Sequence, residues 1–315
     1  MTWRRVRPGP ARKLAHLKEY GGSMKLGLHI SDFTWAGGAP ELRVKLGQIA
    51  QRAEEAGVDR ISVMDHLWQI GVIGPPEHEM LECYTALGWL AAKTERVKLL
   101  TMVTAVVYRE PGLLAKAVTT LDVLSGGRAI LGIGAAWNAD ESAGLGLFFP
   151  PVAERFERLE EAILICKQMW SGNEGPFDGK HYHLGRTLNS PQVLSRPHPP
   201  ILIGGSGEKK TLKLVARHAD ACNIAAYDLA TTAHKLDVLR QHCADEGRNY
   251  DEIEKTAQTR FDLGEHGENV NQVIENLHRV AELGFSQAHG SLLRVSQPGQ
   301  LDILAEQVIP AVAKF

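Results

Sequence analysis

The chain has 315 residues, of which 44% are hydrophobic and 23% charged, and its formal net charge is −2. This is the composition of a globular protein with a large core, and the length suits one α/β barrel that carries an insertion. The near-neutral charge gives no electrostatic reason to expect nucleic acid or an anionic membrane as a partner. In addition, no apolar segment approaches the ~20 residues of a membrane span. We therefore expect neither nucleic acid nor a membrane as a partner.

The predicted elements begin at Met24, where short apolar segments start to alternate with amphipathic ones. The predicted strands are 25–30, 60–64, 97–103, 128–133, 201–203, 221–225, 256–263 and 286–289. The predicted helices that follow them are 41–56, 81–93, 111–124, 153–170, 208–218, 231–246, 269–283 and 300–313. The alternation favours a closed (β/α)8 TIM barrel, and an open doubly wound sheet is the alternative.

Two segments do not fit this alternation. Residues 1–23 are rich in arginine and lack the apolar core of a secretory signal. We interpret 1–23 as a basic N-terminal extension, with a targeting segment as the alternative, and we expect a cytoplasmic protein whose barrel spans 24–315. Residues of about 171–200 contain several prolines and glycines and are too many for a plain connection. They predict an insertion between the fourth helix and the fifth strand.

The ends of the strands are where a parallel barrel places its chemistry. The second strand ends at Asp65 and His66, a carboxylate beside the side chain that titrates near neutral pH. This pair fits a site in which His66 donates or accepts a proton. Asp65 would orient the imidazole or contact a cofactor. A loop pair that only satisfies local backbone groups is the alternative.

The fourth strand ends in Gly132-Ile-Gly134, followed by Ala135 and Asn138. Two glycines permit a tight turn and the close approach of a flat ring, although simple loop packing explains them as well. A dinucleotide fingerprint needs a third glycine, and Trp137 stands in its place. The motif therefore does not indicate a dinucleotide site.

The fifth strand is followed by Gly204-Gly205-Ser206-Gly207 and at once by the predicted helix from Glu208. Such a loop leaves backbone N–H groups free at a helix N-terminus, where the helix dipole favours an anion. The Ser206 hydroxyl adds a donor. The spacing is not that of a Walker loop, so we predict a phosphate-binding loop of another kind, with a simple helix cap as the alternative.

No metal site is indicated. His181 and His183 could supply half of one, but no cysteine or carboxylate cluster accompanies them, and a solvated loop explains them better. The four cysteines are widely spaced and form no C-x-x-C pair, so we expect free thiols in a reducing compartment.

Several motifs together resemble the luciferase-like flavin and deazaflavin oxidoreductases. They follow one another in order from residue 25 to the C-terminus, and the segment around Asp65 and His66 is similar to the branch that uses coenzyme F420. The motifs are Val63-Met-Asp-His66, Leu121-Asp-Val-Leu-Ser-Gly-Gly-Arg128, Leu131-Gly-Ile-Gly-Ala-Ala-Trp-Asn138, Gly179-Lys-His-Tyr182 and Pro199-Pro-Ile-Leu-Ile-Gly-Gly-Ser-Gly207.

The resemblance implies roles for individual residues. His66 is expected near the site of hydride transfer and Asp65 at the cofactor ring. A non-prolyl cis peptide bond is expected between Thr101 and Met102, behind the ring. The edge of the cofactor is expected against Gly134, Ala135 and Asn138, and its phosphate at Gly205, Ser206 and Gly207.

These expectations define the functional hypotheses. The first is hydride transfer between F420 and a small organic substrate by a homodimer. An FMN-dependent two-component monooxygenase and a non-catalytic flavin-binding barrel are the alternatives. Some sugar-phosphate-oxidising members carry an acidic residue in the loop after the fourth strand, where Trp137 is aligned here. That difference argues for another substrate, bulkier or more apolar.

Overall fold

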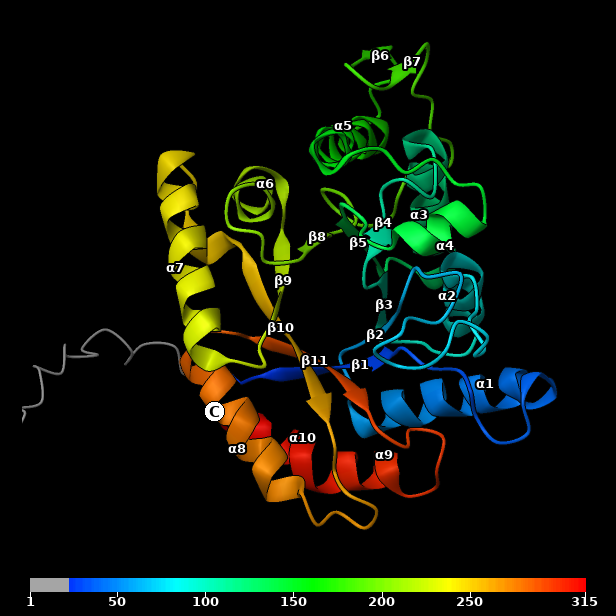
Figure 1. Ribbon diagram of the computed structural model, residues 1–315, viewed down its shortest axis with the longest axis vertical. Coiled ribbons are helices and arrows are strands. Elements are labelled where there is room, and N and C mark those ends of the chain that lie inside the picture. Colours follow the sequence, from blue (N-terminus) through cyan, green and yellow to red (C-terminus); the bar gives the residue numbers. More distant parts are fainter. Residues whose placement is uncertain (1–22) are drawn as a thin grey trace, which may run out of the picture.

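The computed structural model describes residues 23–315, and its strands form a closed parallel barrel with helices around the outside (Figure 1). The predicted (β/α)8 TIM barrel is confirmed, and the open sheet is wrong. Nearly all of the N-terminal extension lies outside the described residues. The barrel strands are β1 (Lys25–Ile30), β2 (Arg60–Val63), β3 (Lys98–Thr101), β5 (Ala129–Gly134), β8 (Ile201–Gly204), β9 (Ala221–Ala225), β10 (Glu254–Phe261) and β11 (Gln287–Leu292).

The sheet runs in the order β3-β2-β1-β11-β10-β9-β8-β5, and the pairing of β3 with β5 closes the ring. A two-residue strand, β4 (Thr104–Ala105), adds to the end of β5 just beyond β3. Every pair within the barrel is parallel, for example Leu99 with Ala129 and Leu131 with Ile201. The carboxyl ends of all strands therefore meet at one face of the barrel, where the loops that precede the helices can converge.

The helices pack their apolar faces on the barrel. Pro111 occupies the first turn of one helix, and Gly57 and Gly126 end two of them in left-handed conformations with φ of 91° and 72°. The helices between strands are α1 (Ala39–Ala56), α2 (Cys83–Ala91), α3 (Pro111–Ser125), α5 (Val152–Trp170), α6 (Thr211–His218), α7 (Leu229–Asp245) and α8 (Val270–Glu282). No helix in residues 23–315 has the length and apolarity that a membrane crossing requires.

Strand residues alternate between two apolar layers. Leu99 and Leu131 are fully buried on the outer face against the helices, in the large core cluster. Leu100 and Ile130 point to the interior, where they form a small cluster with Leu202 and Ala221. Burial of one such leucine contributes about 2 kcal/mol. Met102 and Val103 pack on this interior cluster, so it supports the backbone segment directly after β3.

Two residues of the Leu121–Arg128 motif hold the structure together instead of forming a site. The Arg128 guanidinium donates to the carbonyl oxygens of Ala91, Thr94, Val97 and Ser125, and so joins α2, β3 and α3. Asp122 accepts from the backbone N–H groups of Leu194 and Ser195 and from the Ser195 hydroxyl. It anchors the long segment between α5 and β8, which carries the hairpin β6 (Phe177–Asp178) and β7 (His183–Leu184).

Three elements differ from the prediction. A short helix, α4 (Ala139–Gly144), follows β5 and was not predicted. α6 begins at Thr211, after a turn at 208–210, instead of at Glu208. The last predicted helix is divided into α9 (Gln300–Ile303), a π-helical turn (Leu304–Val308) and α10 (Ile309–Val312). Pro310 lacks the N–H that a continuous helix would use there.

Candidate functional site

A cavity of about 440 Å³ opens at the carboxyl ends of the strands, and it collects most of the residues predicted from the sequence. The ends of β2, β5 and β8 and the segment after β3 contribute to its wall. The predicted residues that line it are Asp65, His66, Met102, Gly134, Ala135, Asn138, Gly205, Ser206 and Gly207. Residues more than 140 positions apart in the sequence thus share one wall because the strands are parallel.

Thr101, which was expected behind the cofactor ring, is not part of this wall. The residue is only 1% exposed, and its hydroxyl bonds to the Thr104 hydroxyl at 2.7 Å and to the Gly132 carbonyl at 2.9 Å. The expected position of the cis peptide bond is wrong by one residue. The bond lies between Met102 and Val103, directly after the end of β3 at Thr101.

The floor of the cavity is built around Val103, which lies between two glycines. A β-carbon on Gly134 would lie 2.9 Å from the Val103 Cγ2, and one on Gly204 would lie 2.7 Å from its Cγ1. Atoms at those distances overlap. Glycine at both positions therefore lets the valine fill the space between β5 and β8, and leaves a shallow apolar surface suited to a flat ring.

The glycine-rich loop after β8 forms one end of the cavity. Gly205 has φ of 107°, a conformation that favours glycine, and its N–H donates to the Asn223 carbonyl. The Ser206 hydroxyl lines the cavity and makes no hydrogen bond within the described part of the chain. Thr211, the first residue of α6, lines the cavity as well. This end offers backbone and hydroxyl donors beside a helix N-terminus, an arrangement suited to an anion.

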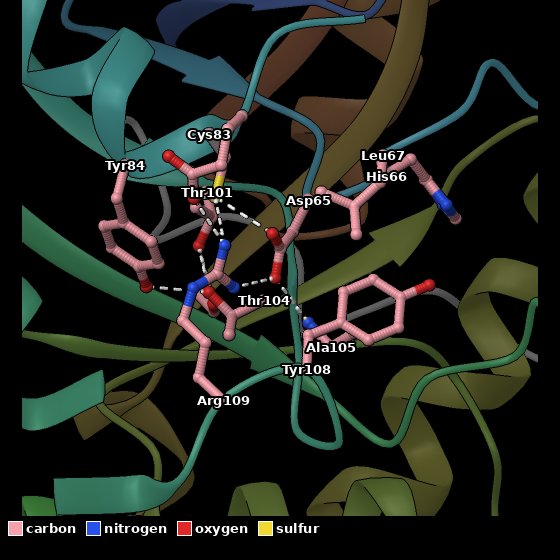
Figure 2. Close-up of polar contacts among 12 residues, drawn as sticks. Asp65, His66, Leu67, Cys83, Tyr84, Thr101, Thr104, Ala105, Tyr108 and Arg109 are labelled. Carbon is pink, nitrogen blue, oxygen red and sulfur yellow. Dashed lines mark hydrogen bonds and ion pairs between the residues drawn. The ribbon is translucent and has the colours of Figure 1, made fainter. Parts of the chain in front are cut away.

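Asp65 lines the cavity, but its carboxylate is occupied by other side chains (Figure 2). It accepts from Arg109 Nη1 at 2.7 Å, from the Cys83 thiol at 3.0 Å and from the Ala105 N–H at 3.0 Å. Burial raises the pKa of the Asp65 carboxyl, and the hydrogen bond and charge of Arg109 oppose that increase. Because all three neighbours donate, we take Asp65 as the anion that anchors Arg109 and the end of β4 at Ala105.

His66 points away from this cluster (Figure 2). Its imidazole contacts Glu141 of α4. The distance from His66 Nδ1 to Glu141 Oε2 is 2.7 Å, and the Tyr108 hydroxyl lies 2.9 Å from the same oxygen. The ring of Trp137 meets the imidazole edge-on, with centroids 5.3 Å apart, and is itself 63% exposed. Asn138 caps α4 and donates its amide to Glu141, so part of its polar capacity is used within the protein.

A second cavity of about 560 Å³ adjoins the first, and His29 and Gln258 line both. Burial lowers the pKa of His29 to about 4, with a hydrogen bond to Ser62 acting in the opposite direction, so its ring is neutral at pH 7. The Gln258 Oε1 atom is buried without a partner in the described residues. Arg260 also lines the second cavity, and its charge helps to lower the pKa of Asp262.

Sequence reasoning missed Glu141, Tyr108, Arg109, His29 and Gln258. For His29 a signal existed, because it is a polar residue within a strand segment that is otherwise apolar and buried. Gln258 had none, because most residues of its strand are polar. Glu141 had no such signal: it belongs to a short helix whose residues look like an ordinary solvated turn. Arg109 and Tyr108 lie in a loop, and only the tertiary structure brings them to Asp65 and Glu141.

Comparison with known proteins agrees with the barrel fold. The family model for luciferase-like monooxygenases matches residues 24–295. An F420-dependent glucose-6-phosphate dehydrogenase of Kineococcus radiotolerans is 33% identical over 94% of this chain and 83% of its own length. The F420-dependent tetrahydromethanopterin reductase of Methanopyrus kandleri superposes with a TM-score of 0.73 at 17% identity, over 91% of this chain and 99% of that one.

A monooxygenase from Streptomyces bottropensis superposes equally well, with a TM-score of 0.75 at 18% identity over 91% of this chain and 99% of that one. At such identities the two solved structures show a shared fold alone. The barrel by itself therefore does not distinguish a reductase from a monooxygenase.

Proposed function

The chain belongs to the luciferase-like monooxygenase family, and we propose that it is an oxidoreductase that transfers a hydride between coenzyme F420 and a small organic substrate. One observation carries this proposal. A single cavity joins an anion-binding loop at Gly205–Gly207, an apolar floor at Val103 and an imidazole at His66. These are the three features that a flat redox cofactor with an anionic tail requires.

The residues of the first cavity fit that cofactor. Gly205, Ser206, Gly207 and Thr211 would hold the phosphate, since they present small side chains and donors at the end of the wall. Met102, Gly134 and Ala135 would contact the ring, because they line the same cavity as the apolar floor at Val103. When bound, F420 supplies a carbon that accepts or gives up a hydride, and the protein supplies position, a proton and exclusion of water.

His66 is the group proposed to exchange the proton. Its imidazole lines the cavity, is held by Glu141 and is covered on one side by Trp137. Replacement by alanine should lower kcat by about 10²–10⁴-fold and leave F420 affinity unchanged, since general acid–base catalysis contributes about that much. Unchanged turnover in His66→Ala would remove His66 from the mechanism.

The second cavity is proposed as the substrate site. It adjoins the first at His29 and Gln258, and the unpartnered Gln258 Oε1 can accept a bond from a substrate hydroxyl. The Arg260 guanidinium, which lines this cavity, favours an anionic group there. The relative from Kineococcus radiotolerans is a sugar-phosphate dehydrogenase by name. We therefore place a hydroxylated anion first, in contrast to the more apolar substrate expected from Trp137.

Titration of the cofactor-free protein with F420 and with FMN, followed by ligand fluorescence, tests the cofactor. We expect F420 to bind at least about tenfold more tightly, a difference of about 1.4 kcal/mol. Preference for FMN would favour the two-component monooxygenase. Binding of F420 without turnover of any alcohol, aldehyde or ketone offered would favour a barrel that only sequesters the cofactor.

The substrate class is tested with Arg260→Gln. We expect the KM for a sugar phosphate to rise about tenfold while the KM for the corresponding neutral sugar stays the same. Arg240→Gln is the matched control, because Arg240 pairs with Asp237 on the surface of α7. An equal KM for both substrates in wild-type protein would contradict an anionic subsite.

A homodimer is proposed from two exposed leucines on α3. Leu113 is 62% exposed and Leu124 is 74% exposed, and their spacing of three helical turns places them on one side of the helix. Leu113→Glu with Leu124→Glu should convert a dimer into a monomer in sedimentation equilibrium. A wild-type monomer would contradict the proposal. Cytoplasmic localisation stays a prediction.

A further inference from the structure

Glu141 is an unusual acid in the barrel, because it is fully buried and every neighbour of its carboxylate can donate. Its Oε1 accepts from the backbone N–H groups of Leu67 and Trp68, the second at 2.9 Å. Its Oε2 lies 2.7 Å from His66 Nδ1, 2.9 Å from the Tyr108 hydroxyl and 3.2 Å from the Asn138 amide. The carboxylate thus connects the loop after β2 to α4 at the position of His66.

These contacts fix the charge of Glu141. Burial alone would raise the pKa of its carboxyl, but the hydrogen bonds from His66, Trp68 and Leu67 hold that pKa below its usual value. Burial and the Glu141 charge raise the pKa of Tyr108, so the phenol keeps its proton and donates. An ionised carboxylate can only accept, which means that the proton in its contact with His66 resides on Nδ1.

We propose that Glu141 is a positioning residue that holds His66 as the Nδ1–H tautomer, so that Nε2 is the ring nitrogen that exchanges a proton with substrate. The exchange of a proton with substrate rests on the proposed function. The assignment of the Nδ1–H tautomer does not. The arrangement follows the same logic as a carboxylate that orients a catalytic histidine in a hydrolase. Tyr108 and Asn138 complete it by fixing the carboxylate.

The proton and hydride then balance. In the oxidation of an alcohol, bound F420 would supply the hydride acceptor for the C–H bond, and His66 Nε2 would accept the O–H proton, which leaves a carbonyl group. The resulting imidazolium is stabilised by the Glu141 charge, which is already in place and needs no reorganisation. In the reverse direction the same imidazolium returns the proton to the alkoxide oxygen as hydride arrives.

The tautomer of His66 in cofactor-free wild-type protein is the direct test. Side-chain ¹⁵N chemical shifts of histidine-labelled protein distinguish Nδ1–H from Nε2–H, and the signal is assigned by its loss in His66→Asn. We expect Nδ1–H at pH 8. An Nε2–H form would overturn the proposal. This readout does not depend on F420: a protein that showed Nδ1–H but did not bind F420 would contradict the proposed function and leave the tautomer assignment standing.

Glu141→Gln gives the second readout, because the amide keeps the shape but can donate to Nδ1. We expect the Nε2–H signal to appear and kcat to fall about 10²-fold or more, with KM and F420 affinity changed less than about threefold. Glu160→Gln is the matched control. Glu160 Oε1 lies 2.8 Å from His218 Nε2, and neither residue lines the cavity. An unchanged tautomer and kcat in Glu141→Gln would overturn the proposal.

A third variant covers the case in which Glu141→Gln does not fold. Tyr108→Phe removes one donor from Oε2 but keeps the charge. We expect Nδ1–H to remain and kcat to fall less than about tenfold, the share of one neutral hydrogen bond. A change of tautomer in Tyr108→Phe would show that Tyr108, and not Glu141, determines the form of His66.

Discussion

The Arg109 guanidinium lies 2.7 Å from the Asp65 carboxylate, and both groups are withdrawn from solvent at the edge of the cofactor cavity. Arg109 reaches Glu82 with its other nitrogen and lies over the ring of Tyr84, with its Cζ 4.9 Å from the centroid. A loop that follows β4 is thereby attached to the residue directly before His66. The position of the imidazole thus depends on an ion pair that does not touch it.

Asp65→Asn should destabilise the protein by about 3 kcal/mol, because it leaves a buried guanidinium without its nearest anion. Glu82 remains as a partner, so the loss should fall at the low end for a broken buried pair. The midpoint of urea unfolding measures it. Asp178→Asn makes the same chemical change on the exposed hairpin, where Asp178 pairs with His183. Equal midpoints for the two variants would refute a structural role for Asp65.

Gly134→Ala should weaken F420 binding about tenfold, since overpacking typically costs about 1–3 kcal/mol. The new methyl group overlaps Val103, which can move only toward the cavity or the interior cluster. Adding Val103→Ala should restore affinity by making room. Gly88→Ala is the control, because nothing lies within 4 Å of a β-carbon at that position. If the double variant does not regain F420 affinity, the loss in Gly134→Ala does not come from overlap with Val103.

Ser206→Asp should weaken F420 binding by about tenfold or more, since it places a negative charge where a phosphate is expected. Ser206→Ala removes only the hydroxyl and should weaken binding less than about fivefold, the value of one neutral hydrogen bond. Fluorescence titration measures both affinities. If the aspartate variant binds F420 as tightly as the alanine variant, the loop at Gly205–Gly207 does not hold the anionic tail.

Stability should fall as the pH drops from about 6.5 to about 4, in part because of His29. Its pKa is lowered in the folded state, so in this window the unfolded chain binds a proton that the folded protein does not, and protonation favours unfolding. A shift from 6.5 to about 4 is worth about 3 kcal/mol at full effect. His289, buried in the barrel, acts in the same direction, since burial lowers its pKa well below 6.5.

Urea unfolding of wild type and His29→Gln at several values between pH 4.5 and pH 7.5 measures this contribution. The variant should lose less stability on acidification than wild type. His183→Gln, on the exposed hairpin, is the matched control for replacing a histidine. Parallel stability curves for wild type and His29→Gln would show that His29 does not contribute.

The periodicity of the sequence was sufficient for the barrel. Apolar segments such as 201–203 and 221–225 are short, and amphipathic segments of helical spacing separate them, so a parallel sheet with outer helices is the arrangement that buries both. Some observed boundaries differ from the predicted ones. For example, α6 begins at Thr211 because a turn at 208–210 precedes the helix. The short α4 was missed because six residues carry too little periodicity to recognise.

By itself, the sequence determined the fold class, the strand ends that face the cavity and the candidate residues His66, Gly134 and Ser206, because these depend on local periodicity and on the rule that parallel strands end on one face. Only the tertiary structure decided which groups contact one another: Glu141 with His66, Arg109 with Asp65, and Thr101 turned away from the cavity. Those contacts join residues that lie 31 to 75 positions apart. No local pattern encodes them, because side-chain partners are fixed by the packing of the closed barrel.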